Sequence, residues 1–322
     1  MMFMSFGDDT LKNFEQLQKR FRLVAIIFAV IKKFSDDQGN LFVVLLGWYS
    51  FMSFYPLLLI VVTALNLIGE KSLGTHVVNI LERFPVVGKE FVSVGNSRRL
   101  SGSILALMVG LVSLVYGSLG VGRALQKSFF HVWNIPRLYK GSLVFRLYHN
   151  FLTLLVLGTV LLLNSLAASF SLGTSVHVLL AVPSLLAICI VNVYAYHLIF
   201  SLQKPKGISV GSNWPGSLSA GLLFTIITTI GTSLLWHELI HSSETYGAFA
   251  QVIGIIAFLL LVAKITIYSC ELNCVLTKTL FPRSFTKKDL TEADRRVYEL
   301  LILEQQTDPA QEITIIQLPG IP

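Results

Sequence analysis

Charged residues are scarce in this sequence. Asp, Glu, Lys and Arg make up 13% of its 322 residues, whereas a soluble domain usually carries about 25%. Hydrophobic residues reach 53%, and the mean hydropathy is +0.69. Long stretches contain no charge, and about 20 apolar residues cross the hydrocarbon core of a bilayer as a helix. The composition therefore excludes an ordinary soluble domain and predicts a helical membrane protein.

Cysteine is also rare. Cys189, Cys270 and Cys274 all fall inside apolar segments, without a CxxC pair or a His–Cys metal spacing. We therefore expect small buried apolar side chains rather than a disulfide framework or a zinc site. Residues 1–20 lack a continuous apolar core and a small-residue cleavage site, so no cleavable signal peptide is expected.

Six apolar segments predict the fold class, an all-α polytopic membrane bundle of six transmembrane helices plus an N-terminal amphipathic interfacial helix. The transmembrane domain is predicted at 41–276. Its spans are expected at about 41–68, 102–126, 147–171, 176–201, 216–236 and 247–276. Pro56 removes a backbone hydrogen bond and predicts a kink in the first span. Gly117 and Gly120 permit close helix contact by the second span.

The two flanking segments carry their own patterns. Apolar residues recur at spacings of three and four over 11–34, within the predicted region 1–40, and basic residues occupy much of the remainder. This pattern favours a helix lying on an anionic leaflet, or alternatively one packed on the cytoplasmic side of the bundle. In the tail, 277–322, Thr291 and Asp294 resemble a capping box that opens a helix ending near residue 304. Disorder is expected beyond it.

The distribution of Lys and Arg predicts the orientation. With six spans, nineteen of these residues lie on the face that holds both termini, and five lie on the other face, all in the loop 69–100. The positive-inside rule therefore places both termini in the cytoplasm. The formal net charge is +7, but the basic residues are divided among loops instead of forming one stripe. No nucleic-acid partner is predicted.

Three charged residues lie within the predicted spans, where each costs about 2.5–3.5 kcal/mol on insertion scales and is a functional candidate. Arg123 and Glu271 lie at similar depths near the cytoplasmic ends of two parallel spans, which predicts an ion pair between them. Alternatively, Arg123 reaches lipid phosphates and Glu271 bonds hydroxyl groups of another helix. Lys264 lies near the membrane midplane and has no obvious acidic partner.

Lys264 and Glu271 are two helical turns apart, with Tyr268 between them. This spacing places the three side chains on one helical face, which predicts a polar cavity open to an anion, or alternatively a structural role in the bundle. The site candidates for substrate or ion-pair contacts are therefore Arg123, Lys264, Tyr268, Glu271 and Asn273. The predicted partners are membrane lipids with anionic headgroups. A homo-oligomer or envelope-protein partners stay open.

Signals for an enzyme are weak. His237, Glu238 and His241 match the short His–Glu–x–x–His pattern, but the next span follows at once where a zincin helix would continue. Metalloprotease activity is a remote alternative, and no metal is expected. Because the sequence contains no Walker A or dinucleotide fingerprint, no cofactor is predicted. We expect a protein that is not an enzyme.

Several stretches follow one another in the order and spacing of a known family. They are Ser53–Leu59 (SFYPLLL), Gly122–Phe129 (GRALQKSF) with Trp133, Pro205 with Trp214–Leu218 (WPGSL), and Tyr246–Ala248 (YGA), Ala257–Leu259 (AFL) and Tyr268–Asn273 (YSCELN). Together they resemble the YihY/BrkB family of bacterial inner-membrane proteins over about 40–276. Glu271 and Asn273 match its last motif. Phe258 replaces a frequent Trp, and Lys264 stands where an uncharged or amide residue is expected.

The resemblance implies a six-span protein of the bacterial inner membrane that contributes to envelope integrity and handles lipids. Together with the charged span residues, it favours a transporter or a component that moves or organises lipids or other amphiphiles. A non-catalytic membrane scaffold is the alternative. The ribonuclease label that this family has carried gains no support, because metal-dependent RNA cleavage needs a His/Asp cluster on a soluble surface and these histidines are dispersed.

Overall fold

The structure is a computed structural model. It describes residues 21–68, 104–136, 148–153, 156, 159–160, 178–204, 209–231, 248–284 and 291–306, and all regular structure in these ranges is helical. The all-α class is therefore confirmed. The elements are α2 (Arg22–Asp36), α3 (Gly39–Ile68), α6 (Ile104–Val132), α8 (Val178–Gln203), the 3-10 helix η1 (Val210–Asn213), α9 (Trp214–Ile226), the π-helix η2 (Ile227–Gly231), α11 (Ala248–Thr277) and α12 (Glu292–Glu304).

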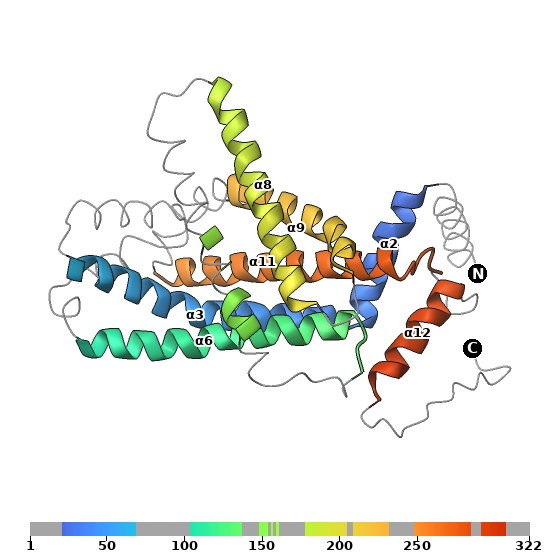
Figure 1. The fold of residues 1–322 in the computed structure, drawn as a ribbon, viewed down its shortest axis with the longest axis horizontal. Coiled ribbons are helices and arrows are strands. Elements are labelled where there is room, and N and C mark those ends of the chain that lie inside the picture. Colours follow the sequence, from blue (N-terminus) through green and yellow to red (C-terminus); the bar gives the residue numbers. More distant parts are fainter. Residues whose placement is uncertain are drawn as a thin grey trace, which may run out of the picture.

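Helix α11 is the centre of the described bundle and packs against α2, α3, α6 and α9. Helices α3 and α6 form one closely packed pair, and α8 and α9 form another (Figure 1). Helix α2 crosses the long axis of α3, α6 and α11 steeply at one end of the bundle, and α12 lies at that same end. The bundle axis and the axis of α2 therefore differ strongly in direction.

Two described helices are long and apolar enough to cross a membrane, at Leu185–Gln203 and Val252–Thr277. A shorter apolar segment covers Gly39–Ser53. These segments fall in the predicted first, fourth and sixth spans. Most of the predicted third span (147–171) and the end of the fifth lie outside the described residues, as do the first twenty residues and the loop 69–100. The number of six spans stays a prediction.

Two glycines bring α3 and α6 close together. A Cβ atom at Gly117 would lie 2.8 Å from the Cα atom of Ser53, and one at Gly120 would lie 2.2 Å from the ring of Tyr49. Both distances are too short for any side chain, so the contact requires glycine at these positions. The packing role predicted for Gly117 and Gly120 is confirmed.

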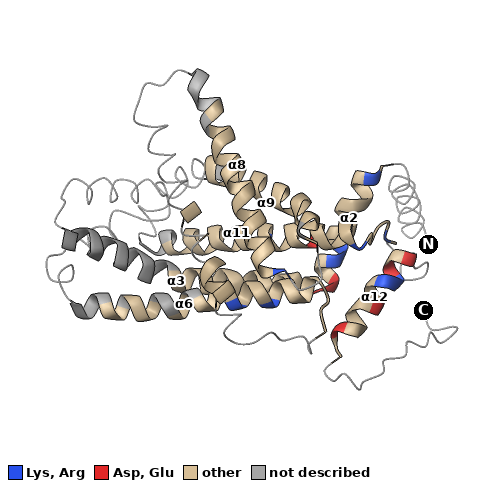
Figure 2. Ribbon diagram, viewed as in Figure 1, with Lys and Arg blue, Asp and Glu red and all other residues tan. Residues whose placement is uncertain are grey.

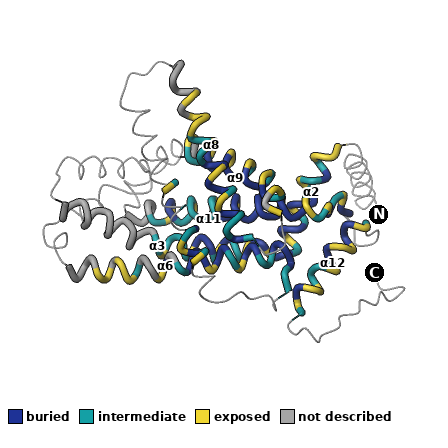
Figure 3. Tube along the Cα trace, viewed as in Figure 1, coloured by how far each residue is buried: buried dark blue, intermediate teal, exposed yellow. Residues whose placement is uncertain are grey.

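Helix α2 is amphipathic in an inverted sense. Leu23, Ile27 and Ile31 form one stripe and are 75%, 60% and 51% exposed, whereas Lys33 is fully buried. Figure 3 shows exposed and buried residues alternating along this helix. Water would disfavour the exposed apolar stripe, but lipid would not. The predicted apolar face over 11–34 is described only after residue 20, and the position of this helix on the membrane surface stays a prediction.

The tail helix begins at the predicted capping box. Thr291 accepts a hydrogen bond from the backbone N–H of Asp294, and the Asp294 carboxylate accepts one from the backbone N–H of Thr291. These bonds satisfy donors that a helix N-terminus otherwise leaves open. The helix ends at Glu304. The prediction of a capped helix ending near residue 304 is confirmed.

Candidate functional site

Acidic and basic residues gather where α2, α12 and the C-terminal end of α11 meet (Figure 2). Ion pairs and hydrogen bonds connect these groups across four helices. We call the cluster the ionic anchor. It consists of Lys32, Lys33, Asp36, Asp37, His131, Glu271, Lys278, Arg283, Asp294 and Glu304.

Two pairs of residues on α2 divide the ionic anchor into two halves. Lys32 and Lys33 precede Asp36 and Asp37 by four residues, which is one helical turn. Neighbouring residues of a helix point about 100° apart. Lys33 and Asp37 consequently face α11, while Lys32 and Asp36 face the segment after α11 and the start of α12.

Lys33 is the most enclosed cation of the anchor, with a side chain that is fully buried. Its Nζ atom donates to a carboxylate oxygen of Asp37 and to the backbone carbonyl of Val132, 2.8 Å away. The Oε2 atom of Glu271 lies 3.0 Å from the same nitrogen. Burial alone would lower the pKa of Lys33, but the nearby Glu271 and Asp37 carboxylates hold this pKa above its ordinary value. Lys33 is therefore charged and joins α2, α6 and α11.

The predicted ion pair between Arg123 and Glu271 is wrong. Glu271 is fully buried against Lys33, whereas the side chain of Arg123 is exposed on α6. Depth along parallel helices was a sound criterion, but depth does not determine which face of a helix a side chain occupies. The approach of α2 from the side supplies a closer cation, and Lys33 takes the position that sequence spacing gave to Arg123.

The predicted stripe of Lys264, Tyr268 and Glu271 is divided by α2. The ring of Tyr268 stacks on Phe34 with centroids 4.1 Å apart, and Glu271 is buried one turn further on. Lys264, one turn before Tyr268, is exposed. Helix α2 therefore covers this face of α11 at Tyr268 and Glu271 and leaves it open at Lys264. Among the described residues, the buried Glu271 and the exposed Lys264 therefore have different surroundings.

Asn273 connects α11 to the start of α9. Its Oδ1 atom accepts a hydrogen bond from the backbone N–H of Gly216 at 2.6 Å, and its side chain is almost fully buried. The bond satisfies a donor in the first turn of α9, which the Trp214–Pro215–Gly216 sequence opens. A Cβ atom at Gly216 would lie 2.2 Å from the carbonyl oxygen of Ser269. Asn273 and Gly216 thus fix α9 against α11.

Asp294 is the hub of the second half of the anchor. Its Oδ1 atom accepts hydrogen bonds from Lys32 Nζ and Arg283 Nε, each at 2.8 Å, and its Oδ2 atom accepts one from the backbone of Ser284. Burial would raise the pKa of Asp294, but these donors, with Thr291, hold it well below its ordinary value. Arg283 also pairs with Asp36. The capping residue of α12 therefore also fastens α12 to α2.

His131 joins α6 to the other end of α12. Its Nδ1 atom contacts Oε1 of Glu304, and its Nε2 atom lies 2.8 Å from the backbone carbonyl of Asp37. A protonated imidazole can donate to both partners at once, because each ring nitrogen then carries a hydrogen. Partial burial would lower the pKa of His131, but the hydrogen bond and the charge of Glu304 raise it. His131 therefore links α2 and α12 most strongly in its protonated form.

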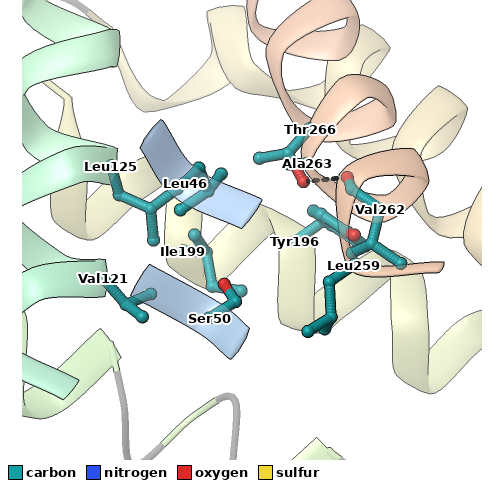
Figure 4. Close-up of a pocket in the computed structure, with 10 residues that line it drawn as sticks. All are labelled: Leu46, Ser50, Val121, Leu125, Tyr196, Ile199, Leu259, Val262, Ala263 and Thr266. Atoms are coloured by element: carbon teal, nitrogen blue, oxygen red, sulfur yellow. Dashed lines mark hydrogen bonds between the residues drawn. The ribbon is translucent and has the colours of Figure 1, made fainter. Parts of the chain in front are cut away.

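A small cavity lies further along the bundle, away from the ionic anchor. Its volume is about 70 Å³, and residues of α3, α6, α8 and α11 line it (Figure 4). The lining is mostly aliphatic, with polar atoms from Ser50, Tyr196 and Thr266. The Thr266 hydroxyl donates to the Val262 carbonyl at 2.9 Å. The cavity suits a short apolar group more than a charged one.

Pro56 lies within α3, and the backbone is helical on both sides of it. Its side chain is outside the described residues, and so are His237, Glu238 and His241. The kink at Pro56 stays a prediction. In the described part of the chain, no group of three His, Cys, Asp or Glu residues is arranged to hold a metal ion.

Sequence reasoning missed Lys33 as the partner of Glu271. The signal was present, since Lys32, Lys33, Asp36 and Asp37 form two pairs spaced by four residues at the end of an apolar helix. A charge run of this type is usually solvated, which concealed its burial. The same expectation of solvation concealed the ion pairs made by Lys32, Arg283, Asp294 and His131.

Two long apolar helices, together with charged residues gathered at one end of the bundle, are features that suit a helical membrane protein. The family model described as Virulence factor BrkB matches residues 30–293, and the chain belongs to this family. The resemblance to the YihY/BrkB family is confirmed. Comparison with curated proteins and comparison with solved structures each gave no match.

Proposed function

We propose that this protein is a six-span protein of the bacterial inner membrane that moves or organises anionic lipids or similar amphiphiles and so contributes to envelope integrity. The role is non-enzymatic. Lys264 carries the proposal, because it is an exposed cation at the middle of the apolar segment Val252–Thr277. A cation at that depth costs about 2.5–3.5 kcal/mol. An anionic amphiphile that enters from the lipid offsets this cost.

The surroundings of Lys264 suit an amphiphile. Ile253, Ala257 and Leu261 continue its exposed face at spacings of three and four residues. An apolar track therefore leads to a single positive charge, which matches a hydrocarbon chain attached to an acidic headgroup. In the described part of the chain, no carboxylate forms an ion pair with Lys264.

The level of the membrane boundary supports a deep position for Lys264. Trp214 and Tyr194 are 43% and 56% exposed and pack edge to face, as aromatic residues do at the headgroup level. Trp214 begins α9 beside Asn273 of α11. Nine residues separate Asn273 from Lys264, which corresponds to about 13 Å along a helix. Half of a hydrocarbon core is about 15 Å thick, so Lys264 lies near the midplane.

The end of the bundle that carries the ionic anchor supports the proposed orientation. Helices α2 and α12 meet α11 at this end, and α2 carries an exposed apolar stripe. This arrangement agrees with a helix lying flat in the interface. Combined with the excess of Lys and Arg on this face, it supports cytoplasmic termini.

Native mass spectrometry of protein extracted gently with its own lipids tests this function. The wild type is compared with Lys264→Ala and Arg123→Ala, and Arg295→Ala is the matched control, because Arg295 is an exposed cation on α12. We expect a defined anionic lipid on the wild type and on Arg295→Ala, and its loss from Lys264→Ala. The Arg123→Ala variant shows whether Arg123, the second exposed cation on a predicted span, also contributes to lipid binding.

Identical lipids on all four proteins would contradict the lipid role. The scaffold alternative would then be favoured, and α12 gives it a specific basis. Ile302 and Leu303 are 38% and 41% exposed on a helix outside the bundle, a surface that suits a protein partner. A cross-linked envelope protein lost on substitution of these two residues would support that alternative.

A further inference from the structure

We propose that Asp37 and Glu271 form a proton-binding site, in which one proton is shared between two buried carboxyl groups beside Lys33. The site does not depend on a lipid substrate. It lies where α2 ends, two residues before α3 begins, and against the last two turns of α11. Its ligand is the hydrogen ion itself.

The balance of charge around Lys33 is the first argument. Both carboxyl groups contact the same Nζ atom, and the side chains of Asp37 and Glu271 are 1% and 0% exposed. One ammonium neutralises one carboxylate. A second buried carboxylate at the same place has no ammonium of its own in contact, which favours uptake of a proton. Pairs of carboxyl groups this close share a single proton.

The contact between the two carboxyl groups is the second argument. Asp37 and Glu271 both contact Lys33 Nζ, which brings the two carboxyl groups close to each other. Ionised carboxylates only accept hydrogen bonds, so a bond between them requires one to be protonated. The buried Oδ1 atom of Asp37 and Oε1 atom of Glu271 have no donor among the described residues. A shared proton supplies that donor.

The groups around the pair come from every element packed against it. The backbone carbonyl of Val132 on α6 accepts a further hydrogen bond from Lys33 Nζ. His131 forms a hydrogen bond with the backbone carbonyl of Asp37 and not with its carboxyl group. Lys278 donates to the carbonyl of Trp133. The other titratable neighbours are Cys270, Cys274 and Tyr268 on α11 and Glu304 on α12. None of these groups provides the missing donor between the two carboxyls.

Release of the proton has a structural consequence. Asp37 and Glu271 belong to different helices, so the shared proton bonds α2 to α11. Its loss leaves two negative charges facing one ammonium, which repel each other across the contact. Asp36, the next residue, has a side chain that is 25% exposed, so solvent lies close to the site. Proton uptake is thereby linked to the docking of α2 on the bundle.

Infrared spectroscopy of the purified protein at neutral pH tests the proposal, because a protonated carboxyl group has a carbonyl stretching band that a carboxylate lacks. The wild type is compared with Glu271→Gln. Gln is isosteric, and its amide donates to Asp37 without a titrating proton. We expect the band to decrease by about one carboxyl equivalent, and to shift in heavy water only in the wild type. Glu299→Gln, an exposed position on α12, is the control and should keep the band.

Asp37→Asn tests the same bond from the other carboxyl group and covers the case in which Glu271→Gln fails to fold. It leaves Glu271 as the single carboxylate beside Lys33, so the band should again be lost. An unchanged band in the folded variants, or no protonated carboxyl band in the wild type, would overturn the proposal. Either result would mean that both carboxylates are ionised, and neither depends on whether lipids bind.

Discussion

The two halves of α11 are held by different kinds of interaction. Toward its C-terminal end, Glu271 and Asn273 are fully enclosed by ion pairs and hydrogen bonds to α2 and α9. Toward its middle, aliphatic residues surround a small cavity, and Lys264 is exposed. Directional bonds fix geometry, whereas apolar contacts within lipid do not. The anchored half therefore sets the position of the helices, and the apolar half is free to accommodate a ligand.

This difference separates two charges that look alike in the sequence. Lys33 and Lys264 both lie beside apolar residues. Lys33 has three hydrogen-bond or ion-pair partners inside the protein, so its substitution should destabilise the fold. Lys264 has an exposed side chain, so its loss should damage binding instead.

The largest effect is expected from Lys33→Met. The substitution keeps the apolar volume of the side chain but leaves two buried carboxyl groups without their cation. Breaking a buried pair in this way costs about 3–5 kcal/mol. The unfolding free energy in detergent, followed by tryptophan fluorescence, should fall by this amount. Lys127→Met removes an exposed cation from α6 and should leave it unchanged. Equal stability of the two variants would remove the distinction between the two regions.

A smaller effect is expected from Gly216→Ala. The added methyl group would lie 2.2 Å from the carbonyl oxygen of Ser269 and would displace the first turn of α9 from α11. Overpacking of this kind costs about 1–3 kcal/mol. Gly211→Ala is the control, because the nearest atom to its new methyl group, Oγ of Ser209, is 3.7 Å away. Thermal unfolding should rank Gly216→Ala well below both the wild type and Gly211→Ala.

The smallest effect is a pH dependence at His131. Its pKa is raised in the folded protein by Glu304, so the stabilisation is complete below the unfolded value of about 6.5. It is lost as the pH rises through the folded value. Hydrogen exchange of the α12 amides should therefore accelerate as the solution becomes alkaline, after correction for the intrinsic rate. In Glu304→Gln this additional acceleration should be absent. The same pH response in both proteins would show that His131 does not hold α12.

The general architecture could be predicted because it depends on local patterns. Runs without charge predicted the apolar helices, and the spacing of Thr291 and Asp294 predicted the start of α12. Glycines in α6 predicted a close helix contact, and the structure shows that the partner is α3. In each case, the physical cause lies within a few residues of the pattern itself.

The partners of the charged residues could not be predicted from local patterns. Glu271 and Lys33 are separated by more than two hundred residues, and their contact depends on the steep crossing of α2 over α11. Arg123 lies at a similar predicted depth to Glu271, but its side chain is on an exposed face of α6, so the two residues do not pair. Interhelical pairing requires the rotation of each helix about its axis. A single sequence gives the periodicity of a helix, but the rotation comes from packing.

The central claim is that Lys33, and not Arg123, is the partner of Glu271. Two double-mutant cycles measured by unfolding in detergent test it directly, one with Lys33→Ala and Glu271→Ala and the other with Arg123→Ala and Glu271→Ala. We predict a coupling energy of about 0.5–3 kcal/mol in the first cycle and additivity within about 0.5 kcal/mol in the second. Coupling of Glu271 to Arg123, with none to Lys33, would contradict the account.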